Sequence, residues 1–168
     1  ILTTSGIATG AGGINFGNTL TTINGTLQIN NFGFVTGFAP TYAVNSNLVY
    51  NSTGLFDRNV EWGTTSGPGY PYNVTAQNTT NLRLNFPNLN GNANRAIAGT
   101  LTIANGSTVL VSTTDPSTLT IWKDLVINGT LTMPTVAGGD VYVGRNWNRS
   151  ATGVFTDNDR AVFFNGSD

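Results

Sequence analysis

Carboxylates are the main chemistry-bearing side chains of this 168-residue sequence, because it contains no His and no Cys. Their absence excludes nucleophilic triads with a His base and metal sites built from His or Cys. Paired-carboxylate chemistry, as in polysaccharide-degrading enzymes, remains open. Asp57 beside Arg58, and Asp124 beside Lys123, indicate surface charge at chain turns. We therefore predict no catalytic residues and no enzyme, with a carboxylate-based polysaccharide-degrading enzyme as an alternative. The acids are Asp57, Glu61, Asp115, Asp124, Asp140, Asp157, Asp159 and Asp168.

The run Asp157-Asn158-Asp159 is the best candidate for a metal site. Alternating oxygen ligands in a loop can hold Ca²⁺, but this run lacks the glycine and the distal glutamate of an EF-hand. Such a run between strands is also typical of a polar turn. We predict no metal and no cofactor, and keep Asp157 and Asp159 as the calcium candidates.

Three aromatic residues lie on or beside a stretch rich in Gly and Pro, residues 63–71. Trp62, Tyr70 and Tyr72 are the candidates for glycan binding, because aromatic rings stack on the apolar faces of sugars. The structural interpretation is that these rings cover the flank of the fold or its core. A carbohydrate-binding adhesin module, with surface polysaccharide as its partner, is therefore a second hypothesis.

Composition narrows the class of protein further. Charged residues make up 9% and the net charge is −1, so there is no basic stripe for a nucleic-acid backbone. Hydrophobic residues make up 39%, and no apolar run approaches the ~18 residues of a membrane-spanning helix. We predict no nucleic-acid partner and no membrane insertion. The sequence begins at Ile1 without a visible signal peptide, which we interpret as a segment of a longer exported polypeptide.

A drifting period of 20 to 26 residues organises the sequence. Its clearest copies are residues 24–29, 99–103 and 128–133, each of which contains Gly-Thr-Leu. Such a period is typical of stacked structural repeats. The positions taken as equivalent are Ile23, Val49, Val74, Ile97, Ile121, Val143 and Phe163.

Apolar and polar residues alternate within the repeats, as along Ile97–Ile103, and Asn-Gly corners follow. We predict an all-β fold, a right-handed parallel β-helix of about six to seven coils that forms one domain over residues 1–168. Residues 1–40 are less regular first coils or an interface segment. Residues 63–71 form a protruding loop and 88–94 a second loop. The alternative is an antiparallel β-sandwich, because Asn-Gly also favours hairpins.

The order of several short motifs resembles the repeat region of large secreted and cell-surface proteins of Bacteroidota. The motifs are LVYNSTG, EW followed by SGPGYPYNV, RAIAGTLTI, NGTLTM, GGDVYVGRNW and RAVFFNGS, and they span residues 45–168. The resemblance implies an extracellular, adhesin-like β-solenoid exported by the type IX machinery.

These observations predict a structural repeat module of a bacterial surface adhesin or filament. An uncapped solenoid exposes strand edges and core at its ends, so we expect contact through residues 1–35 and 154–168 with copies of itself or adjacent repeats. Whether residues 1–35 pair in cis or in trans stays open, as does stalk against filament. The interface candidates are Ile14, Phe16, Phe32, Phe34, Val154, Phe155, Val162, Phe163 and Phe164.

Overall fold

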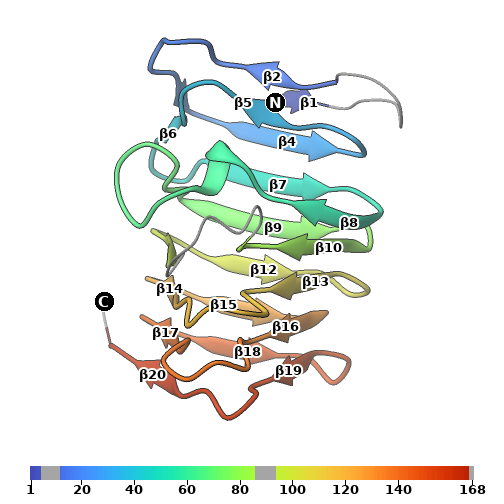
Figure 1. Cartoon of the computed structure of the whole chain (residues 1–168), viewed down its shortest axis with the longest axis vertical. Helices are drawn as coiled ribbons and strands as arrows, with labels where there is room; N and C mark the ends of the chain where they lie inside the picture. The colour runs from blue at the N-terminus through green and yellow to red at the C-terminus, as the bar shows by residue number, and fades with distance from the viewer. Residues whose placement is uncertain (5–11, 86–93, 167–168) are drawn as a thin grey trace.

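The chain forms a parallel β-solenoid, seen from the side in Figure 1. The computed structural model describes residues 1–4, 12–85 and 94–166. Every strand pairing in these residues is parallel, and each strand pairs with the equivalent strand of the next coil. The predicted β-helix is therefore confirmed, and the antiparallel sandwich is wrong. Within the described residues, no helix has the length and apolar character needed to cross a membrane.

One sheet runs the whole length of the solenoid and defines six turns between its first and last strands. Leu2 pairs with Leu27, for example, and Leu125 pairs with Trp147, so one coil spans 25 residues at the start and 22 at the end. We call it the first sheet. Its strands are β1 (Leu2–Thr4), β4 (Thr26–Asn30), β7 (Asn47–Asn51), β9 (Asn73–Gln77), β12 (Leu101–Ile103), β15 (Leu125–Ile127) and β18 (Trp147–Arg149).

Two further sheets close the later coils. The second sheet holds β8 (Gly54–Asp57), β10 (Thr80–Arg83), β13 (Thr108–Leu110), β16 (Thr130–Thr132) and β19 (Val154–Thr156). The third sheet holds β11 (Arg95–Ile97), β14 (Leu119–Ile121), β17 (Val141–Val143) and β20 (Val162–Phe164).

The first two coils close differently, through two short two-stranded sheets. One pairs β2 (Ile14–Asn15) with β5 (Val35–Thr36), and the other pairs β3 (Thr22–Ile23) with β6 (Thr41–Tyr42). In the third coil, a 3-10 turn, η1 (Val60–Trp62), stands where later coils have a third-sheet strand. Residues 63–71 form the predicted loop, and residues 88–93 of the other predicted loop lie outside the described residues.

The core consists of columns of inward-facing side chains, one per coil. The first-sheet register aligns Leu27, Leu48, Val74, Leu101 and Leu125, all at most 1% exposed. Because successive side chains of a strand face opposite sides, the residues between these columns face outward. Because apolar side chains stack on one another in each column, apolar surface is removed from water along the whole axis. This burial is the main favourable term in the folding free energy.

Polar side chains at the ends of the first-sheet strands form hydrogen-bonded ladders from coil to coil. The side-chain amide of Asn51 donates to Asn30 Oδ1 at 2.8 Å, and the side-chain amide of Gln77 donates to Asn51 Oδ1 at 3.0 Å. These bonds run between coils, parallel to the backbone ladder, as in stacked parallel sheets. Asn residues, in which the sequence is rich, therefore contribute to coil stacking.

The register corrects two details of the sequence period. Residues 99–103 lead into β12 of the first sheet, whereas 128–133 lead into β16 of the second sheet, so these two copies are not equivalent. Ile97 and Leu101 lie on different strands, because a corner at 98–100 interrupts the predicted strand. The period is right, but the motif that marks it recurs at different corners of the coil.

Two Asn-Gly-Thr corners give a matched test of this packing. A Cβ at Gly129 would lie 2.2 Å from the Ser107 carbonyl oxygen and 2.4 Å from that of Ala104, while a Cβ at Gly25 would meet nothing within 4 Å. We expect Gly129→Ala to lower the free energy of unfolding by about 1–3 kcal/mol through overpacking. Gly25→Ala should change it by less than about 1 kcal/mol. Urea unfolding of both variants measures the difference, and equal effects would contradict the close coil contact at Gly129.

Candidate functional site

The acidic residues that the structure describes are spread over the coils and make local contacts; Asp168 lies outside the described residues. Asp57 binds the Arg83 guanidinium of the next coil through both oxygens, one at 2.7 Å. Asp124 binds Arg145 of the following coil in the same manner, which lowers the pKa of Asp124 to about 2. Asp140 accepts a hydrogen bond from the Ala161 amide at 2.9 Å. Among the described residues no three acids gather into a group that could hold a metal.

The calcium candidates Asp157 and Asp159 form a polar turn between β19 and β20. The Asp159 amide donates to Asp157 Oδ1 at 3.3 Å, and the Arg160 amide donates to the Asp157 carbonyl at 3.0 Å. Asn158 and Asp159 both have positive φ, 51° and 60°. Left-handed Asn and Asp residues are typical of tight turns. The residues of this run thus have a structural role in reversing the chain.

The three glycan candidates do not form a common aromatic surface. Trp62 is fully buried, and its indole N–H donates to the Ala96 carbonyl at 2.9 Å. The glycan-binding prediction for Trp62 is therefore wrong, because a buried ring cannot stack on a sugar. It fills the core where η1 replaces a strand. Tyr70 is half-buried, and its role in binding stays a prediction.

Tyr72 is engaged within the solenoid. Its hydroxyl accepts a hydrogen bond from Lys123 Nζ at 2.8 Å, and the ammonium lies 5.2 Å from the ring centroid. Gly99 lies beneath the ring, where a Cβ would come within 2.9 Å of Tyr72 Cδ1. The ring thus covers a glycine corner and contacts a lysine two coils further along the chain. Tyr72 remains partly exposed, so its proposed contact with a glycan stays a prediction.

Glu61 is the most unusual ionisable residue, because it is fully buried inside the third coil. Its Oε1 accepts a hydrogen bond from the Tyr50 hydroxyl at 3.0 Å and another from the backbone N–H of Asn59 at 2.8 Å. Its Oε2 has no partner, and burial raises the pKa of this carboxyl. Arg58 is also buried and donates to the Leu84 carbonyl, so the prediction that Asp57 and Arg58 are both surface charges is wrong for Arg58. Burial lowers the Arg58 pKa.

The C-terminal end of the solenoid is an apolar face with open strand edges. In the described residues, β18, β19 and β20 each pair only with the strand of the preceding coil. Trp147 packs edge-on against Phe155 and Phe164, with ring centroids 4.9 and 6.4 Å apart. Phe164 is 63% exposed nonetheless. Of the interface candidates at this end, Val154 and Phe163 are exposed, while Phe155 and Val162 are half-buried.

Phe163 faces the flank of the solenoid, not its end. It stacks on Tyr142 of the preceding coil, with centroids 4.9 Å apart and planes 14° apart. The alternation along β20 places Val162 and Phe164 in the columns of Val141 and Val143, which are buried. Phe164 is therefore the residue of this strand that a further coil would cover, whereas the interface candidate Phe163 packs on the flank of the solenoid.

The N-terminal end carries the complementary open edges. Within the described residues, β1, β2 and β3 pair only with strands of the second coil. Ile14 and Phe16 are half-buried against the core, and Phe34 is half-buried beside Gly13. Phe32 is 57% exposed at a turn with φ of 59°. Leu2 is 42% exposed at the head of its core column.

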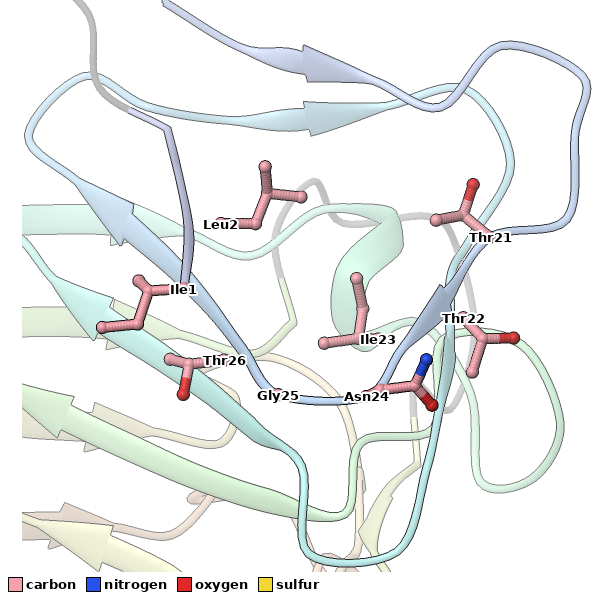
Figure 2. Close-up of a pocket in the computed structure, with 8 residues that line it drawn as sticks. All are labelled: Ile1, Leu2, Thr21, Thr22, Ile23, Asn24, Gly25 and Thr26. Carbon is pink, nitrogen blue, oxygen red and sulfur yellow. The ribbon is translucent and has the colours of Figure 1, made fainter.

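A pocket of about 320 Å³ opens beside this end (Figure 2). It is lined by the start of the chain, by β3 and by the corner that leads from β3 into β4. Apolar side chains of Leu2 and Ile23 and the polar corner around Asn24 share its wall. Its lining residues are Ile1, Leu2, Thr21, Thr22, Ile23, Asn24, Gly25 and Thr26.

Sequence reasoning missed this pocket and the buried Glu61. No local signal marks the pocket, because its walls come from two coils whose spacing depends on register. One feature of the sequence could have indicated that Glu61 is buried: it directly precedes Trp62 in a chain with few charged residues. The open ends were predicted from the strand edges and core that an uncapped solenoid exposes.

The buried carboxyl predicts a pH-dependent stability. Because the pKa of Glu61 is raised in the folded state, its contribution is fully present below the unfolded pKa of about 4.3 and is lost as pH rises through the folded pKa. Glu61→Gln keeps an acceptor for Tyr50 and Asn59 and cannot ionise. We expect the variant to match the parent at pH 4 and to be the more stable at pH 8 in urea unfolding. A variant that loses stability only at pH 8 would show that ionised Glu61 is required.

Comparisons with known proteins return no family: no family model matches the chain, and no curated protein or solved structure matches it significantly.

Proposed function

We propose that this chain is a structural module of an extracellular β-solenoid, which stacks end to end with another copy or an adjacent repeat. The observation that carries the proposal is the state of both terminal coils in the described residues. Each has strand edges without a neighbouring coil, next to apolar side chains that the next coil would cover. Open edges of this kind are templates for pairing with another chain.

Energetic reasons support stacking. Strand edges leave backbone N–H and C=O groups without protein partners, and a further coil supplies them. Phe164 and Leu2, exposed at opposite ends, lose contact with water in the same step. The contact is heterologous, since one end meets the other, and a heterologous contact that does not close into a ring gives a filament.

The proposed location is the bacterial cell surface. It rests on the resemblance of residues 45–168 to Bacteroidota surface repeats, and on a low charge that suits a structural rod better than a nucleic-acid or metal-binding protein. Contacts within the rod join neighbouring coils, as in the pairs Asp57–Arg83 and Asp124–Arg145. A role as stalk or filament needs such axial continuity more than it needs a cleft.

A matched pair of exposed apolar residues tests the proposal. Phe164 lies at the end of the solenoid and is 63% exposed, whereas Leu55 lies on the flank of the third coil, in β8 at the edge of the second sheet, and is 58% exposed. We expect Phe164→Asp to abolish concentration-dependent self-association in light scattering, because a charge would be buried at the contact. Leu55→Asp should leave association unchanged. A parent chain that stays monomeric, or a Leu55 variant that matches Phe164→Asp, would contradict end-to-end stacking between copies.

A further inference from the structure

One corner of the solenoid gathers aromatic and positively charged side chains. It lies where β14 and β17 of the third sheet lead into β15 and β18 of the first sheet (Figure 1). The Gly99 N–H donates to the Tyr72 carbonyl at 2.7 Å, and the Lys123 N–H donates to the Gly99 carbonyl at 3.2 Å. The next coil adds Arg145, whose N–H donates to the Lys123 carbonyl at 2.9 Å. We call this column the basic corner; its residues are Tyr72, Gly99, Lys123 and Arg145.

The ammonium of Lys123, the only lysine of the chain, is held in place at this corner. Its Nζ donates to the Tyr72 hydroxyl at 2.8 Å and lies 5.2 Å from the centre of that ring. Gly99 in the intervening coil makes the contact possible, because a Cβ there would lie 2.9 Å from Tyr72 Cδ1. An ammonium has three N–H donors, so two remain for a further partner.

No carboxylate balances the charge of Lys123 among the described residues, whose ion pairs are Asp57–Arg83 and Asp124–Arg145. The adjacent Asp124 is engaged by other groups. Both its oxygens bind the Arg145 guanidinium, and Oδ1 also accepts hydrogen bonds from the backbone N–H and the side-chain amide of Asn146, at 3.2 and 2.7 Å. The corner therefore carries an excess positive charge, in a chain whose net charge is −1.

Trp122, directly before Lys123, adds an exposed aromatic ring. It follows the buried Ile121, faces outward and is 44% exposed. The register of the third sheet places it level with Ala98 in the preceding coil and with Gly144 in the next. Because both of these residues are small, the indole is the only large side chain at this position of the three coils.

We propose that Trp122 and the basic corner bind an acidic sugar of a polysaccharide, with the sugar ring on the indole and the sugar carboxylate on the Lys123 ammonium. The C–H groups of a sugar ring form an apolar face that stacks on an aromatic ring. A carboxylate accepts charge-assisted hydrogen bonds from an ammonium. A neutral sugar would leave the Lys123 charge unbalanced, so charge complementarity favours the acidic class.

This binding function is separate from end-to-end stacking, because the corner lies on the flank of the coils. It moves the contact with a glycan away from Trp62, which is buried, to Trp122. The two groups that the ligand needs, a ring and a cation, then come from consecutive residues of one coil. Their spacing is set by the chain itself and does not depend on a loop.

Titration calorimetry with polysaccharides of known composition tests the proposal. The probes are polygalacturonate, alginate and hyaluronate, which carry carboxylates, and dextran, which is neutral. We expect at least one acidic polymer to bind, with an affinity that falls as salt screens the charges, and dextran not to bind. Trp122→Ala should weaken binding about tenfold through the lost ring contact, and Lys123→Met about tenfold through the lost charged hydrogen bond. Phe38→Ala removes a ring that is 52% exposed outside the corner and should bind like the parent.

Acrylamide quenching of fluorescence gives a second measurement, which needs no variant. Trp122 is the most exposed of the three Trp residues, so a bound acidic polymer should protect the parent chain from quenching. Urea unfolding checks that the variants fold, and quenching of the parent decides if one does not. Failure of every acidic polymer to bind, equal binding of dextran, unchanged affinity in either folded corner variant, or binding without protection would each overturn the proposal. None of these results bears on stacking, which light scattering tests separately.

Discussion

Backbone pairing between coils is the interaction on which this structure depends. A strand in the middle of the first sheet, such as β12, has neighbours on both edges, β9 and β15, and its polar backbone groups are satisfied there. No disulfide, metal cluster or long helix shares this task in the described residues. In the described residues, the strands of the first and last coils pair on one side only, as do β5, β6, β8 and β11 where the coils change the sheets that close them.

The interior is organised by the same repetition, and its exceptions are informative. Where η1 replaces a third-sheet strand, the space is filled by Trp62 and by Glu61 with its hydrogen bonds to Tyr50 and Asn59. A buried carboxyl is costly when ionised, and its raised pKa expresses that cost. The third coil thus joins two parts of the solenoid that close their coils with different sheets. We expect the ionisation of Glu61 in this coil to lower the stability of the fold as pH rises.

Much of the fold was predictable from the sequence, because a period of about two dozen residues and strand alternation both follow from stacking. The Gly-Thr-Leu motifs gave a wrong alignment of the coils, because they are not structurally equivalent: Leu101 lies in the first sheet and Leu131 in the second. A corner needs glycine for close approach wherever it occurs, so the motif marks corners in general. The burial of Trp62 agrees with the structural interpretation that its ring covers the core. The burial of Arg58 was not predictable, because it depends on the absence of a strand in that coil. The pocket depends on register between coils, which local sequence does not specify.

The central claim is that copies of the solenoid stack end to end. Electron microscopy of the native protein at high concentration tests it most directly, with the axial repeat as the quantity measured. Seven strands spaced about 4.8 Å apart give a repeat of roughly 34 Å for one copy, and the account predicts unbranched filaments with that repeat. Dispersed single particles at every concentration, or filaments with a twofold axis at each junction, would contradict it.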